Sequence, residues 1–125
     1  MIRKFSLSVL ALTLIALGCH AIALAGAVPG PQTRNNYVSA KYDKTDTYFF
    51  VFKGGEPARI RVINQSNKGD INLYVYDLDG RLLVSDVRRD DDADVTFYPR
   101  NTDQFRVVVR AVAGNSPLKY QLRTN

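Results

Sequence analysis

Aspartates gather in the middle of the sequence, and their carboxylates are the side chains best suited to chemistry. Carboxylate oxygens are the ligands that Ca²⁺ prefers, at about six to eight per ion. The candidate ligands are Asp70, Asp77, Asp79, Asp90, Asp92 and Asp94. Counting from Asp77, an EF-hand would need a carboxylate where Arg88 stands. Two interpretations stay open: a calcium site, or turn residues and solvated charges beside Arg88 and Arg89.

Tyrosines and arginines recur at alternate positions of the apolar segments, where they point away from the aliphatic residues. The set comprises Tyr74, Tyr76, Tyr98, Arg59, Arg61, Arg106 and Arg110. Tyr and Arg are enriched at the energetic centres of protein interfaces, and aromatic rings also stack on sugars. The alternative is ordinary packing, in which the two residue types cover each other on a solvated sheet. We treat the set as one candidate binding face.

Most of the chain lacks the residues that enzymes use as nucleophile or base. His20, Cys19 and Met1 are the single residues of their types, and the sequence has no Trp. The serines beyond residue 25 have no histidine to activate them, which excludes a Ser-His-Asp site. Catalysis would have to rest on carboxylates, Lys, Tyr or Ser in unusual settings, for example on a pair such as Asp70 and Asp94 acting as acid and base. The composition therefore favours a protein that is not an enzyme.

Residues 1–25 have the pattern of a secretory signal peptide. Arg3 and Lys4 precede an apolar run over residues 5–17. Small residues then alternate over residues 21–25, as signal peptidase requires. We expect cleavage after Ala25 and export of the remainder to the periplasm or the medium.

Two other fates of this leader stay open. Residues 16–19 resemble a degenerate bacterial lipobox with Cys19 as the lipidated residue, although a leucine is expected where Ala16 stands. Residues 5–28 are also long enough to span a bilayer, which takes ~20 residues, and to stay as an uncleaved membrane anchor. All three readings place the domain outside the cytoplasm: secreted, periplasmic or lipid-anchored in the envelope. Only the leader would then contact a membrane.

The net charge gives some indication of partners. The full chain carries +5. Without Arg3 and Lys4, 15 Lys and Arg stand against 12 Asp and Glu, a net charge of +3. The basic residues are scattered among the strands, whereas nucleic-acid binding requires a basic stripe. We expect no nucleic-acid partner, and a mildly basic exported domain is better suited to the polyanions of a cell envelope.

Beyond the leader, apolar and polar residues alternate with a period of two, as in half-buried strands. In residues 58–63, for example, Ile60 and Val62 share one side and Arg59 and Arg61 the other. Strands are expected at residues 47–53, 58–63, 70–76, 81–85, 95–98, 105–110 and 118–123. Seven or eight short strands without a helix predict an all-β fold, an antiparallel β-sandwich.

The domain boundaries follow from the same pattern. Residues 26–36 contain Pro29, Gly30 and Pro31, which forbid a helix, and they are predicted to be a linker. The β-sandwich is expected to occupy residues 37–125. About 100 residues can bury enough surface for one core without disulfides, and for one domain only.

Four segments of the chain resemble the bacterial pre-peptidase C-terminal domain, which is appended to many secreted peptidases. They are residues 48–52 (YFFVF), 69–75 (GDINLYV), 104–109 (QFRVVV) and 120–122 (YQL). The second resembles the family signature G-D-x-D-L-Y-V, and the third its T-Y-Y-V-x-V strand. Asn72 stands in place of the second aspartate of the signature, and Asp103 in place of the usual glycine before the third segment.

The resemblance implies a jelly-roll-like β-sandwich that does not catalyse, here as a free-standing version. Such domains assist secretion, localisation or substrate attachment of a partner enzyme, and some relatives bind collagen or calcium. We therefore expect a non-catalytic exported binding or localisation module. It would present its Tyr/Arg face, or Asp-bearing loops at one end, to a protein or glycan partner in the cell envelope or outside.

Two alternatives to a binding module stay open. The first is a calcium-stabilised structural or adhesive domain, with calcium as its only cofactor. The second, weaker alternative is a hydrolase that uses a pair of carboxylates.

Overall fold

The protein is an all-β sandwich in a computed structural model that describes residues 26–41, 44–113 and 116–125; the predicted signal peptide, with Cys19, lies outside these ranges. The strands are β1 (Thr33–Val38), β2 (Thr45–Phe52), β3 (Ala58–Asn64), β4 (Asp70–Tyr76), β5 (Leu82–Asp86), β6 (Ala93–Phe97), β7 (Asp103–Ala113) and β8 (Leu118–Thr124). The described residues include no helix that is long and apolar enough to cross a membrane.

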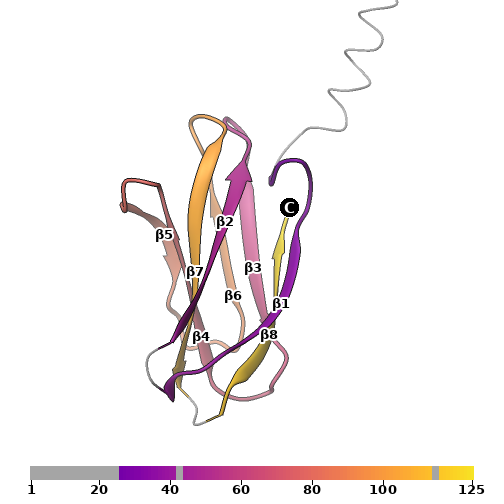
Figure 1. Cartoon of the computed structure of the whole chain (residues 1–125), viewed down its shortest axis with the longest axis vertical. Coiled ribbons are helices and arrows are strands. Elements are labelled where there is room, and N and C mark those ends of the chain that lie inside the picture. Colours follow the sequence, from indigo (N-terminus) through magenta and orange to yellow (C-terminus); the bar gives the residue numbers. More distant parts are fainter. Residues whose placement is uncertain (1–25, 42–43, 114–115) are drawn as a thin grey trace, which may run out of the picture.

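Two antiparallel four-stranded sheets pack face to face (Figure 1). One has the order β1-β8-β3-β6 and is called the β1 sheet below; the other, the β2 sheet, has the order β2-β7-β4-β5. This arrangement of eight strands is that of a jelly roll. The predicted all-β, jelly-roll-like sandwich is confirmed.

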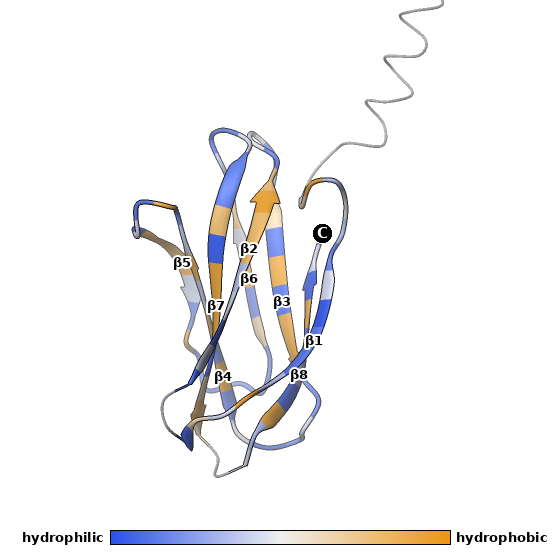
Figure 2. Cartoon of the chain, viewed as in Figure 1, coloured by the Kyte–Doolittle hydropathy of each residue, from blue (hydrophilic) through white to orange (hydrophobic). Residues whose placement is uncertain are grey.

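Alternate residues of most strands supply one apolar layer between the sheets. In β3, Ile60 and Val62 are fully buried, as predicted, while the arginines between them are exposed. The alternation is visible as changing hydropathy along the strands in Figure 2. Three rings, Phe52, Phe97 and Phe105, fill one end of the layer. Phe97 meets the other two rings edge to face, with centroids 5.5 Å from Phe52 and 5.2 Å from Phe105.

A chain of hydroxyl groups links the two sheets near the other end of the layer. Tyr120 of β8 is completely buried. Its hydroxyl donates to Oδ2 of Asp46 at 2.5 Å and lies 2.6 Å from the hydroxyl of Tyr48, both in β2. Burial and the neighbouring carboxylate raise the pKa of Tyr120. The ring therefore stays neutral and acts as a hydrogen-bond donor.

The segment predicted to be a linker belongs instead to the sandwich. Ala27 is 4 % exposed and forms a bridge with Phe52, and the Val28 amide donates to the Val51 carbonyl. From there the chain crosses to the β1 sheet, where β1 begins at Thr33. The boundary at residue 36 was wrong because β1 is polar at every residue but two, and such a sequence carries little strand signal.

Replacing Tyr120 with Phe tests the hydroxyl link between the sheets. The variant keeps the ring but leaves the Asp46 carboxylate and the Tyr48 hydroxyl without their shared partner. We expect a loss of about 1–3 kcal/mol in the free energy of unfolding, measured by urea denaturation. Tyr37→Phe, at an exposed ring, is the control and should change stability by less than about 0.5 kcal/mol. Equal stability of the two variants would contradict the assigned role.

Candidate functional site

The outer face of the β2 sheet carries a row of large side chains that crosses all four strands. Phe49 of β2 lies opposite Arg106 of β7, Arg106 opposite Tyr76 of β4, and Tyr76 opposite Leu82 of β5. Phe49 and Leu82 are 54 % and 49 % exposed. The guanidinium carbon of Arg106 lies 4.4 Å from the centre of the Tyr76 ring, a cation–π contact that orients both groups.

A second tyrosine widens this row into a platform. The rings of Tyr74 and Tyr76 stack along β4 with centroids 6.5 Å apart and planes at 22°. The Asn72 amide, buried on the same side of β4, donates to the Tyr74 hydroxyl at 3.3 Å. Arg110 pairs with Asn72 across the β4–β7 ladder and is exposed at the margin. We call Phe49, Arg106, Tyr76, Leu82 and Tyr74 the aromatic platform.

Two hollows flank the turn between β4 and β5, next to the platform. The smaller, of about 230 Å³, lies between Phe49, Arg106 and the turn residues 77–80. The larger, of about 550 Å³, opens at the end of the sandwich and is lined in part by Arg81, Tyr98 and Arg100. Tyr98 is 72 % exposed at its rim.

The turn between the hollows is fixed by its own hydrogen bonds. The backbone carbonyl of Asp77 accepts from the Gly80 amide at 3.1 Å, and its carboxylate accepts from the Arg81 amide at 2.9 Å. Gly80 has φ +84°, a conformation that glycine adopts without strain. The Asp77 carboxylate is therefore engaged in shaping the turn.

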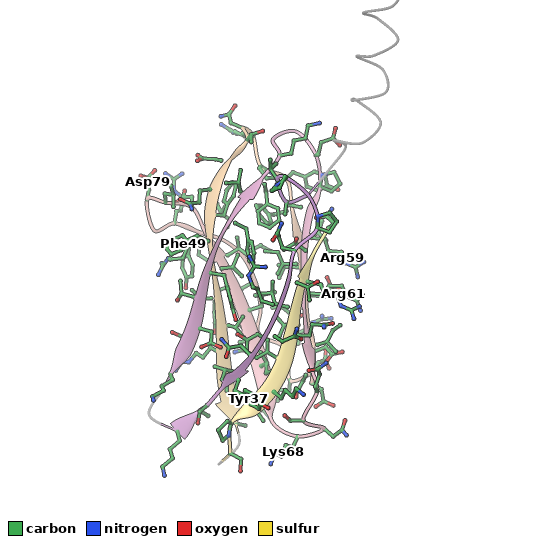
Figure 3. All side chains as sticks on the ribbon, turned by 45° about the vertical axis from the view of Figure 1, so that its right-hand side comes forward. Tyr37, Phe49, Arg59, Arg61, Lys68 and Asp79 are labelled. Atoms are coloured by element: carbon green, nitrogen blue, oxygen red, sulfur yellow. The ribbon has the colours of Figure 1, made fainter. Side chains whose placement is uncertain are left out.

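The predicted Tyr/Arg set does not form one face. Tyr74, Tyr76, Arg106 and Arg110 share the outer face of the β2 sheet, but Arg59 and Arg61 lie on the outer face of the β1 sheet. Figure 3 shows Phe49 on the opposite side of the sandwich from these two arginines. The prediction of a single face was wrong because side-chain alternation does not reveal which sheet a strand joins.

Phe49 and Leu82 are platform residues that were not among the candidates. Phe49 could have been found, because Phe50 and Phe52 form an inward pair that leaves Phe49 and Val51 pointing out. Leu82 could not, since a register shift between Val75 and Tyr76 places it opposite Tyr76. A β-bulge of this kind carries no clear signal in a short strand.

The candidate metal ligands are divided between the two ends of the sandwich. At one end, Asp77 and Asp79 follow the last residue of β4. At the other end, Asp70 is the first residue of β4, Asp90 and Asp92 lie in the β5–β6 loop, and Asp94 lies at the start of β6. Within the described part of the chain, no three His, Cys, Asp or Glu side chains form a group that could hold a metal ion. The six aspartates therefore do not converge on one site.

Most of the aspartates near the β5–β6 loop already have partners. The Asp94 carboxylate accepts from Arg59 and lies 3.8 Å from Nε of Arg61; the Arg59 hydrogen bonds lower the pKa of Asp94. The Asp92 carboxylate accepts a hydrogen bond from the backbone amide of Asn64 at 2.8 Å. The Asp90 carboxylate lies 3.7 Å from Nε of Arg88. Arginines and backbone amides thus compete with any cation for these oxygens.

Asp86 makes the strongest of these interactions. The residue is 5 % exposed, and its carboxylate accepts two hydrogen bonds from the Arg88 guanidinium, at 2.9 and 2.8 Å. It also accepts from the backbone amides of Arg88 and Asp94. The Arg88 guanidinium and these amides outweigh burial and hold the pKa of Asp86 at about 2. Because Asp94 belongs to β6, the carboxylate ties the two sheets together.

Asp70, unlike Asp86, has a raised pKa and a buried oxygen without a hydrogen-bond donor in the described part of the chain. Burial raises its pKa, the nearby carboxylates of Asp90, Asp86 and Asp91 raise it further, and Arg89 opposes them. Its Oδ1 atom and that of Asn72 are buried and accept no hydrogen bond from the described residues. Two oxygens are well short of the six to eight that Ca²⁺ takes.

A comparison with solved structures gives a fold-level relationship. The crystal structure of the pre-peptidase C-terminal domain of collagenase from Bacillus anthracis matches with a TM-score of 0.61 and 14 % sequence identity. The match covers 75 % of this chain and 88 % of that domain. A scan against protein-family models and a search of curated proteins each found no match. The chain therefore shares the fold of a pre-peptidase C-terminal domain.

The Asp86 tie predicts a loss of stability in acid. A carboxyl group with pKa about 2 in the folded state and 3.8 when unfolded stabilises the fold fully above pH 4, and this contribution is lost as the pH falls through 2. The pKa difference corresponds to about 2 kcal/mol. In the Asp86→Asn variant, the free energy of unfolding should therefore fall by about 2 kcal/mol less between pH 6 and pH 2 than it does in the unmodified chain. Asp79→Asn, at an exposed turn, should retain it, and equal profiles for the two variants would contradict the tie.

The divided aspartates also predict the response to calcium. An ion held at ~100 times its Kd adds about 2.7 kcal/mol, which would raise Tm by roughly 10–20 °C for a domain of this size. Because the carboxylates are dispersed and most of them are paired, we expect a change below about 2 °C between millimolar Ca²⁺ and chelator. A large rise would instead support the calcium-stabilised domain and direct attention to Asp70 and Asn72.

Proposed function

We propose that the chain is a non-catalytic exported binding module whose aromatic platform engages a protein or glycan partner outside the cytoplasm. The observation that carries the proposal is the row of Phe49, Arg106, Tyr76 and Leu82, aligned across four strands with its two apolar ends about half exposed. Exposed apolar side chains aligned in this way are typical of interaction surfaces.

The geometry of the platform suits an extended ligand. The two stacked tyrosines offer adjoining ring faces, and Arg106 adds a cation held above one of them. Such groups supply contact area at a small entropic cost, because an aromatic ring has few rotatable bonds. The platform spans the width of a sheet, so a fibrous protein or a polysaccharide chain lying across it would contact all four strands.

The fold relationship supports the same class of function. The structural neighbour is a domain of a collagenase, and a domain of this kind beside a peptidase is suited to holding the substrate polymer. Beyond residue 25 the chain has neither His nor Cys, and the Asp77 carboxylate beside the larger hollow is occupied by the Arg81 amide. These features favour binding without catalysis.

Replacing Phe49 and Tyr76 with Ala tests the platform. Both changes remove contact area from the outer face and leave the core untouched. We expect the unmodified chain to co-sediment with at least one of fibrillar collagen, chitin and peptidoglycan, and the double variant to bind that polymer at least about tenfold more weakly, since losing two anchors costs more than ~1.4 kcal/mol.

Val87→Ala provides the matched control for this experiment. Val87 is 54 % exposed in the β5–β6 loop, at the other end of the sandwich. Its variant should bind as the unmodified chain does, and thermal melts should show that all variants are folded. Equal binding by the double variant and the control would exclude the platform, and no binding to any of the three polymers would contradict the proposed ligand classes.

A further inference from the structure

The outer face of the β1 sheet differs in chemistry from the aromatic platform. On this face, Tyr37 and Asn35 of β1 lie opposite Lys119 and Gln121 of β8. Further along β8, Arg123 lies opposite Arg61 of β3. Arg59 and Asp94 complete the face towards β6. We propose that this basic face, formed by Tyr37, Lys119, Asn35, Gln121, Arg123, Arg61 and Arg59, binds an acidic polysaccharide.

This face carries a net positive charge. Four cations, Arg59, Arg61, Lys119 and Arg123, stand against the single carboxylate of Asp94. Their net side-chain charge of +3 equals that of the whole chain beyond residue 25, which has 15 Lys and Arg and 12 Asp and Glu. The face therefore carries an excess of positive charge. Such a surface attracts polyanions.

The carboxylate of Asp94 does not neutralise the face. It pairs with Arg59, through Nε at 3.0 Å, and more distantly with Arg61. Arg123 donates from Nε to the Gln121 side chain, a neutral group, at 2.5 Å. Lys119 forms no ion pair with the described residues. The positive charges of Lys119 and Arg123 are thus open to a ligand.

The neutral residues of the face favour a sugar polymer over a simple anion. Between the cations, the Gln121 amide donates to Oδ1 of Asn35 at 3.1 Å, which leaves further amide groups for hydroxyls. Tyr37 is 59 % exposed beside Lys119 and offers a ring for stacking. Lys119 and Arg123 are four residues apart on one strand, or about 13 Å, a distance that takes several sugar residues to span.

The shape of the face agrees with a chain that lies along it. The hollow beside Arg59, Arg61 and Arg123 is shallow, at about 190 Å³, so it admits a charged group but does not enclose a ligand. Figure 3 shows Arg59 and Arg61 extending from the side of the sandwich opposite Phe49. The basic face is therefore separate from the aromatic platform, and this proposal does not depend on the platform's function.

Titration calorimetry with polygalacturonate, a carboxylate-bearing polysaccharide, tests the proposal on the purified chain. We expect binding at 50 mM salt that weakens as salt rises, and no binding to neutral dextran. The double variant Arg61→Gln/Arg123→Gln should bind about tenfold more weakly, because each exposed ion pair contributes up to about 1 kcal/mol. Tyr37→Ala should weaken binding several-fold without changing the salt dependence.

The double variant Lys53→Gln/Arg100→Gln is the matched control, because it removes the same charge at the β2–β3 turn and the β6–β7 loop, outside the basic face. A tenfold loss in this control as well would overturn the proposal in favour of unspecific attraction. Binding of polyphosphate or of anionic vesicles as tight as that of polygalacturonate, and unaffected by Tyr37→Ala, would overturn the assignment to a sugar polymer. Phe49→Ala/Tyr76→Ala should bind polygalacturonate normally; a loss there would move the site to the aromatic platform.

Discussion

The apolar layer between the two sheets is the constraint on which the surface chemistry of this protein depends. Most strands give alternate residues to the layer, and the residues between them point to the outer face of their own sheet. β4 and β7 are neighbours in the β2 sheet, so their outward Tyr76 and Arg106 meet. β3 and β8 are neighbours in the β1 sheet, so Arg61 and Arg123 meet on the opposite side. One core thus produces two outer faces of different character.

Polar groups supplement this layer where the sheets are joined, and they account for much of the carboxylate chemistry. Asp86 ties β5 to β6, and Tyr120 ties β8 to β2 through Asp46. A buried carboxylate is stable only when donors surround it, and Arg88 with two backbone amides meets that requirement for Asp86. Oxygens used in this way are poorly available to a cation. The aspartate-rich composition is therefore explained in large part by structure.

The fold could be predicted from the sequence far better than the site. Period-two alternation located β4 at Asp70–Tyr76, with Ile71, Leu73 and Val75 buried as expected. It failed for β1, whose sequence TRNNYV has little apolar content. The pairing of strands depends on contacts between segments far apart in the chain, so alternation could not separate Arg61 from Arg106. The burial of Asp86 likewise depends on the approach of β6.

The position of the two faces on opposite sides has a consequence for localisation. Packed sheets lie about 10 Å apart, so a ligand on the aromatic platform and a polymer on the basic face would not collide. The buried residues of both sheets form one hydrophobic core between the two faces, so each face would keep its geometry when the other is occupied. A rigid domain with two independent faces can hold two partners close together, which raises the effective concentration of one near the other. Tethering of that kind needs no catalytic residue.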